Sequence, residues 1–112
     1  MQTMIVYYHC KDGQRDAFMA AIKMEKIAEN SRVEPGNMQY DYFMPVDDAN
    51  TVLLLEKWES DEAQKIHTAT DNFKKLGEIK AKFVESVEIE KLGCRDAVRP
   101  KNIETVYTPS LQ

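Results

Sequence analysis

The sequence has few of the residues that mark disulfide-rich, zinc-binding or disordered proteins. Its two cysteines, Cys10 and Cys94, are too few for a disulfide framework and do not form a CxxC pair. Because the chain also has only two histidines, a zinc site is not expected. Four glycines and four prolines in 112 residues argue against a low-complexity or disordered chain.

Long apolar runs and an excess of positive charge are missing as well. The longest apolar runs, at 4–8 and 52–55, are only long enough for strands, so we expect no membrane span. The N-terminus lacks the charged and apolar regions of a signal peptide, and we therefore expect a soluble, cytoplasmic protein. Fifteen basic and nineteen acidic residues give a net charge of -4, without a basic stripe that could follow a nucleic-acid backbone.

Common catalytic and nucleotide-binding motifs are absent too. The chain contains no GxGxxG, GxxxxGKS/T, GxSxG or HExxH, the signatures of dinucleotide-binding proteins, P-loop proteins, serine hydrolases and zinc metalloproteases. What remains is a single domain, 43% of it hydrophobic, which is sufficient for one core.

Hydrophobic periodicity predicts an α+β domain. Strands are expected at 3–9, 37–44, 51–58 and 84–92, and the second should have Met38, Tyr40, Tyr42 and Met44 on one face. A helix over 14–32 is expected to end at a turn containing Pro35 and Gly36, where Gly36 can adopt a positive φ. Further helices are expected after a cap at Ser60 and after one at Thr70 or Asp71. The order is β-α-β-β-α-β, the ferredoxin-like arrangement of an antiparallel sheet.

This arrangement predicts a homodimer. The sheet should have the order 4-1-3-2, and its two central strands are apolar on both faces. The helices can cover only one of these faces, so the other requires a partner, and a second copy is the simplest one. We expect the domain to span residues 1–93.

The ends of the strands also bear on the cysteines and on the tail. Cys10 and Cys94 follow antiparallel neighbours and should lie at opposite ends, about 20 Å apart, as free thiols. Residues 94–112 form a polar tail that is either a free end or a segment that wraps the partner subunit. Its five apolar residues favour wrapping.

Three stretches together resemble the antibiotic biosynthesis monooxygenase (ABM) family of dimeric α+β barrels. They are SRVEPGNMQY at 31–40, LEKWES at 55–60 and AQKIHTATDNF at 63–73. The family pattern is approximately Arg-x-Glu-Pro-Gly-Asn-x-x-Tyr, then Glu-x-Trp, then Ala-x-x-x-His followed by Thr-x-His-Phe. This chain departs from the pattern at Asn72, where many members have His, and a mechanism that needs two imidazoles therefore fits poorly.

The resemblance implies a monooxygenase that acts without a cofactor or metal on a small aromatic or quinol-like molecule. Two alternatives stay open: an isomerase that transfers a proton on a small hydroxyketone, and a small-molecule-binding module without catalysis. Haem degradation fits poorly, because those members have Trp at the position that matches His67.

His67 and Glu56 are the candidate catalytic residues. His67 lies one helical turn after Ala63 and should face the sheet, where an imidazole can accept a phenolic proton near neutral pH. Glu56 follows three leucines in a central strand, and a buried carboxylate there needs a partner. It could orient His67, bind substrate or form a structural ion pair, and His67 could equally be a locally bonded helix histidine.

The candidate substrate-binding residues are aromatic rings and amides that either line a pocket or belong to the core and turns. Large flat side chains suit an aromatic ligand, and amides can donate to its oxygens. These candidates are Tyr40, Trp58, Phe73, Phe83, Asn37 and Asn72. His9 lies at the end of a strand, on the face opposite to Tyr8, and is expected to meet solvent.

Overall fold

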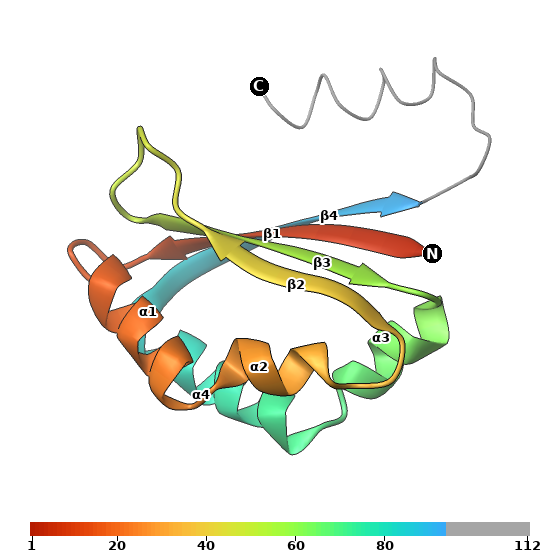
Figure 1. Cartoon of the computed structure of the whole chain (residues 1–112). Coiled ribbons are helices and arrows are strands. Elements are labelled where there is room, and N and C mark those ends of the chain that lie inside the picture. The colour runs from red at the N-terminus through yellow and green to blue at the C-terminus, as the bar shows by residue number, and fades with distance from the viewer. Residues whose placement is uncertain (94–112) are drawn as a thin grey trace, which may run out of the picture.

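The computed structural model describes residues 1–93 as one sheet covered by helices (Figure 1). The elements are β1 (Gln2–Cys10), α1 (Arg15–Met24), α2 (Ile27–Arg32), β2 (Asn37–Phe43), β3 (Thr51–Trp58), α3 (Asp61–His67), α4 (Asp71–Phe83) and β4 (Val84–Gly93). The ferredoxin-like α+β architecture predicted from the sequence is confirmed. None of the helices within these residues is both long and apolar enough to cross a bilayer.

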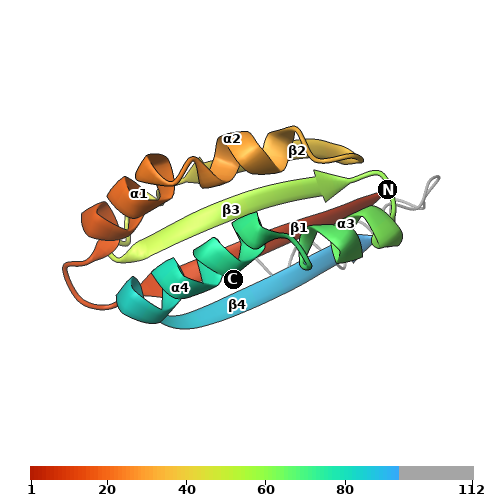
Figure 2. The ribbon, with the colours of Figure 1, turned by 90° about the horizontal axis from the view of Figure 1, so that it is seen from below.

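The sheet has the order β2-β3-β1-β4, and every neighbouring pair is antiparallel, as predicted. Val6 on β1 lies opposite both Leu54 on β3 and Ile89 on β4, which fixes which side chains share a face. All four helices lie on one side of the sheet: α1 and α2 run along β2 and β3, and α3 and α4 run along β1 and β4 (Figure 2).

The prediction of a single helix over 14–32 is wrong, because the chain forms two helices that meet at Lys26. Lys26 has a φ of 55°, in the left-handed region that ends a helix. Phe18 and Ile22 are buried one turn apart, and a continuous helix would next bury the charged Glu25 and Lys26. The break shifts the phase by about one residue, so that Ile27 is buried instead.

The two later helices begin where the sequence predicts. The Ser60 hydroxyl accepts a hydrogen bond from the backbone N–H of Ala63, and the Thr70 hydroxyl accepts one from that of Phe73. Each cap satisfies an N–H group that the first turn of a helix leaves without a partner.

Strand β2 differs from its expected alternation at both ends. Its register with β3 shifts between Asn37 and Gln39, and Met38 is 58% exposed. Met44 lies beyond the end of the strand and is 51% exposed. Only Tyr40 and Tyr42 of the four expected residues therefore pack against the helices.

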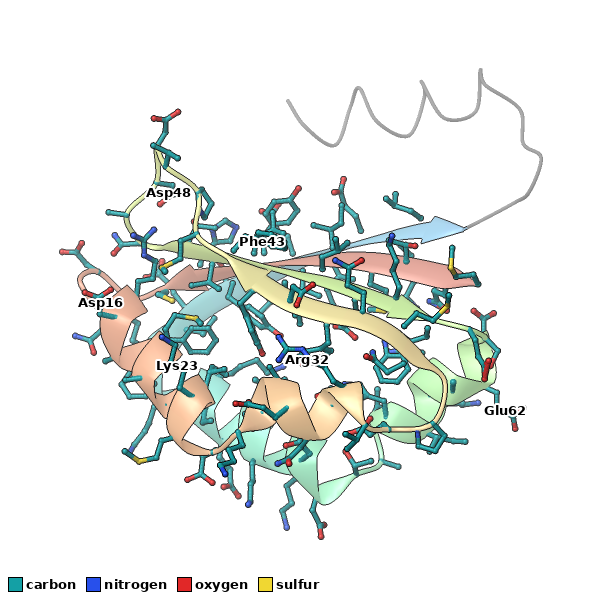
Figure 3. The ribbon with its side chains drawn as sticks, viewed as in Figure 1. Asp16, Lys23, Arg32, Phe43, Asp48 and Glu62 are labelled. Carbon is teal, nitrogen blue, oxygen red and sulfur yellow. The ribbon has the colours of Figure 1, made fainter. Side chains whose placement is uncertain are left out.

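The face of the sheet away from the helices is open and has an apolar centre. Phe43, Leu53 and Tyr7 form one row across the strands, and Leu55 and Ile5 lie in the next row. Phe43 projects from this open face, away from the helices (Figure 3). Acidic residues border the centre on both edge strands; they are Asp41, Glu88 and Glu90.

His9 lies on the open face, as expected, but it is hydrogen-bonded. Its Nδ1 lies 3.1 Å from the Thr51 hydroxyl and its Nε2 lies 2.7 Å from Glu88, so it links β1 to both neighbouring strands. The Thr51 hydroxyl donates to Asp48 at 2.6 Å, which ties the β2–β3 hairpin into the same network.

Cys10 is a buried free thiol at the C-terminal end of β1, where it pairs with Val84 at the start of β4. The C-terminal end of β4 lies at the other end of the sheet, because Gly93 pairs with Gln2. Cys94 and the predicted tail, 94–112, lie outside the described residues.

A tight turn at 34–37 fixes the path from α2 into β2. The backbone N–H of Asn37 donates to the Glu34 carbonyl at 3.1 Å, and Gly36 between them has a φ of 85°. Proline followed by glycine at positive φ is the pattern of a type II turn. Gly36 also lies so close to α3 that a Cβ built on it would be 2.6 Å from that of Ala63.

We therefore expect Gly36→Ala to lower the free energy of unfolding by about 2 kcal/mol, because it combines a strained φ with a steric overlap. The matched control is Gly77→Ala within α4, where a Cβ meets nothing within 4 Å. This control should stabilise the protein by about 0.5–1 kcal/mol. Urea unfolding measures both, and a neutral Gly36→Ala would contradict the packing described for the turn.

Candidate active site

The candidate site lies on the helix side of the sheet, around the last residue of α3. His67 is 2% exposed, and its ring centroid lies 4.7 Å from that of Trp58, with 35° between the planes. Tyr40 and Phe73 meet the same imidazole edge-on, at 5.8 Å and 5.3 Å. Three strand and helix elements thus place aromatic rings on several sides of His67.

The hydrogen-bond partner of His67 is Glu34, in the turn before β2. Nδ1 of the imidazole lies 2.7 Å from Oε1 of Glu34, whose side chain is 14% exposed. The contact joins α3 to a turn 33 residues earlier in the chain. The described residues offer no hydrogen bond to Nε2.

Glu56 is buried beside this centre and has a different partner. It is 6% exposed, and the Trp58 indole N–H donates to its Oε1 at 2.9 Å. Burial raises the pKa of the Glu56 carboxyl, while the Trp58 hydrogen bond and the nearby His67 charge act in the opposite direction. The pKa of Glu56 is therefore raised above its ordinary value, and the carboxylate is close enough to His67 for their charges to interact.

Two tyrosine hydroxyls lie close to each other in the same interior, and neither makes a hydrogen bond of good geometry there. They belong to Tyr40 and Tyr42, which are neighbours on β2 with ring centroids 5.8 Å apart. Burial raises the pKa of Tyr40, and the Glu56 charge raises it further, so this phenol stays protonated and can donate. A buried hydroxyl without a partner costs about 1–3 kcal/mol unless a water or a ligand satisfies it.

Lys80 reaches into this region from α4. Its Nζ lies 6.0 Å from the centre of the Tyr8 ring and 5.6 Å from that of Phe73. Burial lowers the pKa of Lys80, and the Glu56 charge raises it. The two charges attract each other, although the described ion pairs do not include one between them.

The structure brings five of the eight predicted site residues together, places Phe83 elsewhere, and engages the two amides in other hydrogen bonds. His67, Glu56, Tyr40, Trp58 and Phe73 form the centre described above. Phe83 ends α4 beside Cys10, at the far end of the sheet. Its position is set by the β1–β4 pairing, which begins there.

The two predicted amides are occupied by structural hydrogen bonds. The Asn72 amide donates to the Ile27 carbonyl at 3.1 Å and to the Ser31 hydroxyl at 3.0 Å, which ties α4 to α2. The Asn37 amide donates to the Gln39 carbonyl at 3.1 Å, at the register shift of β2.

Glu34, Tyr42 and Lys80 belong to the site although the sequence analysis did not select them. The sequence does point to Glu34, because it precedes Pro-Gly in the stretch 31–40 that resembles the family and that also contains Tyr40. The proximity of Glu34 to His67 depends on the turn and α3 packing together, which residue spacing does not encode.

A hollow of about 450 Å³ opens to the surface beside α3. It is lined by Met1, Gln2, Asp61, Gln64, Lys65 and Lys91. Gln2 lies opposite Trp58 in the β1–β3 register, but none of the residues that surround His67 lines the hollow. Within residues 1–93, no three His, Cys, Asp or Glu side chains are grouped to hold a metal ion.

Comparison with known proteins gives a family match over most of the chain. The profile of the family described as "Antibiotic biosynthesis monooxygenase" matches residues 1–78. A curated relative from Bacillus subtilis (strain 168), named "Putative monooxygenase YcnE", is 36% identical over 73 residues, which are 65% of this chain and 75% of the relative.

Solved structures share the fold. "Putative antibiotic biosynthesis monooxygenase from Nitrosomonas europaea" has a TM-score of 0.76 and 27% identity, covering 84% of this chain and 98% of that one. PA3566 from Pseudomonas aeruginosa also has a TM-score of 0.76, with 23% identity over 84% of this chain and 93% of its own. At that identity the second likeness supports the fold alone.

The raised pKa of Glu56 predicts that the free energy of unfolding depends on pH. The folded state binds this proton more tightly than the unfolded state does, so the stability of the wild type should fall as pH rises above the ordinary value of 4.5. Glu56→Gln keeps an acceptor for Trp58 and removes the charge. We expect it to raise the free energy of unfolding at neutral pH by about 1 kcal/mol.

Urea unfolding between pH 4 and 8 measures this effect, with Glu78→Gln as the control. Glu78 is an exposed carboxylate on α4, and its substitution should leave the pH dependence of the wild type in place. If Glu56→Gln retained the full wild-type pH dependence, the buried carboxylate would not be its source.

Proposed function

The chain belongs to the antibiotic biosynthesis monooxygenase family, and from this premise we propose that it is a cofactor-independent monooxygenase of a small aromatic or quinol-like molecule. The substrate would bind between the sheet and the helices, beside His67. The observation that carries the proposal is a buried imidazole among aromatic rings, with a basic buried carboxylate, Glu56, close by.

In this proposal His67 is the base. Removal of a phenolic proton by Nε2 would give an electron-rich anion that can react with dioxygen. The low exposure of His67 supports this chemistry, because a site without bulk water protects such an anion from protonation. Glu56 would assist by binding a substrate hydroxyl or by stabilising the protonated imidazole.

The remaining polar groups suit the oxygens of such a ligand. The Tyr40 and Tyr42 hydroxyls can donate to a ligand oxygen, and Glu56 has acceptor capacity beyond its bond to Trp58. The rings of Trp58 and Phe73 provide flat apolar surfaces.

One observation favours a second candidate, a binding module without turnover. Trp58, Tyr40 and His67 are 0%, 1% and 2% exposed, so the protein's own side chains fill much of the site. A ligand would then have to displace packed aromatic rings, which suits slow, tight binding better than rapid turnover.

We also propose that the open face of the sheet forms a homodimer. Ile5, Tyr7, Leu53 and Leu55 are only partly buried in one chain, and together they make a contiguous apolar surface. A second copy would bury this surface, as the two layers of a domain bury theirs.

The catalytic proposal predicts that His67→Ala lowers the rate of oxygen uptake with a reactive quinol by about 100-fold or more, because it removes the general base. The matched control is His9→Ala, which removes the other imidazole of the chain from the opposite face of the sheet. An oxygen electrode with a panel of substituted hydroquinones makes the measurement. Equal rates in wild type and His67→Ala would remove His67 from the mechanism.

A second panel, of small hydroxyketones assayed without oxygen, separates the alternatives. Turnover in that assay would favour the isomerase, and binding without turnover in either panel would favour the module.

The dimer proposal predicts that Leu53→Asp gives a monomer, because it places a charge at the apolar centre between acidic edges. Val46→Asp, at a residue 98% exposed in the β2–β3 hairpin, is the control and should remain dimeric. Sedimentation velocity over a range of concentrations distinguishes the two. A wild type that stays monomeric at high concentration would overturn the proposal.

A further inference from the structure

We infer that Glu34 is a positioning residue for His67: it holds the imidazole proton on Nδ1, so that Nε2 presents its lone pair to the substrate. The inference rests on the proposed function, in which Nε2 is the base. It assigns to Glu34 a part that the sequence analysis considered only for Glu56.

The hydrogen bond itself determines the tautomer. Oε1 of Glu34 lies 2.7 Å from Nδ1 of His67, and an ionised carboxylate can only accept a hydrogen bond. Nδ1 must therefore carry the proton. A neutral imidazole has only one N–H, so Nε2 is left as the acceptor.

The surroundings make this contact rigid. The exposed fractions of the two side chains are 2% for His67 and 14% for Glu34, so water has little access to replace either partner. Trp58 packs against the plane of the imidazole, and Tyr40 and Phe73 meet it edge-on. The rings fix the plane of the imidazole, and Glu34 fixes which nitrogen carries hydrogen.

Glu34 is itself fixed by backbone contacts. Its N–H donates to the Ser31 carbonyl at 3.1 Å, and its own carbonyl accepts from Asn37 at 3.1 Å. The Gly36 carbonyl accepts from the N–H of Glu59 at 2.8 Å, which anchors the turn to the start of α3. The carboxylate therefore approaches His67 from a well-defined position.

Glu56, the other carboxylate near His67, cannot replace Glu34 in this role as the site is arranged. Its carboxylate accepts a hydrogen bond from the Trp58 indole at 2.9 Å, and its influence on His67 is through charge. The two carboxylates thus have different partners, with Glu34 bonded to the imidazole and Glu56 bonded to the Trp58 indole.

This arrangement matters for proton transfer in two ways. A base that carried its proton on Nε2 would meet the substrate hydroxyl as a donor and could not accept from it. Once Nε2 has taken a proton, the negative charge of Glu34 stabilises the imidazolium. Carboxylates that orient a catalytic histidine act in this manner in other enzymes.

The test uses the full chain labelled with ¹⁵N in its histidines, of which there are only two, so that His9→Ala assigns both. Glu34→Met is similar in length and has no acceptor. We expect its ¹⁵N spectrum to show the His67 proton moved from Nδ1 to Nε2. With any quinol that the wild type oxidises, kcat should fall about 10- to 100-fold while KM changes about twofold or less.

Glu59→Gln is the matched control, because it removes a neighbouring exposed carboxylate that does not touch His67. It should change neither the spectrum nor kcat. Should Glu34→Met fail to fold, Glu34→Gln keeps the shape, and its amide should reduce the fraction of the Nδ1–H form.

The inference is overturned if the wild type carries its proton on Nε2, or if a folded Glu34 variant keeps the wild-type tautomer and kcat. If the wild type oxidises no substrate, the proposed function fails, and the ¹⁵N spectra still decide whether Glu34 sets the tautomer.

Discussion

Side chains that alternate along the two central strands decide which groups of this protein meet one another. On β1 and β3, one set of alternate residues is buried against the helices and the other set stays partly open. Because the helices cover only one face, the two faces of the sheet have different environments. The helix side encloses buried polar groups, and the open side offers an apolar surface with acidic edges.

Burying the polar groups on the helix side of the sheet costs folding free energy unless a hydrogen bond or a ligand compensates it. Glu56 and His67 are almost fully buried among aromatic and apolar residues, and the hydroxyls of Tyr40 and Tyr42 are buried beside them without a hydrogen bond of good geometry. A protein of this size could have packed apolar residues there at less cost in free energy. The proposed ligand binding and proton transfer would account for the grouping of these polar side chains.

The sequence predicts the elements of the fold well because strand positions and helix caps depend on local pattern. The four strands, the Ser60 and Thr70 caps and the positive φ of Gly36 all follow from residue type and periodicity. The break at Lys26 was missed, although two charged residues at positions that a continuous helix would bury give a signal for it.

The centre of the site was predicted from resemblance and inward-facing positions, which identified His67 and Glu56. Glu34, the hydrogen-bond partner of His67, was not predicted. Glu34 lies in a turn that packs close to α3 only because Gly36 has no side chain to meet Ala63. The amides of Asn37 and Asn72 were selected as donors, and their hydrogen bonds to backbone and to Ser31 are a matter of tertiary packing. Residue type indicates what a side chain can do, and the packed structure determines what it meets.

A crystal structure of the protein with a bound hydroquinone tests the central claim most directly. The account predicts a ligand ring between the sheet and the helices, with one oxygen within hydrogen-bond distance of Nε2 of His67 and another near the tyrosine hydroxyls of β2. A ligand found only on the open face, or a helix-side interior that stays closed at saturating ligand, would contradict it.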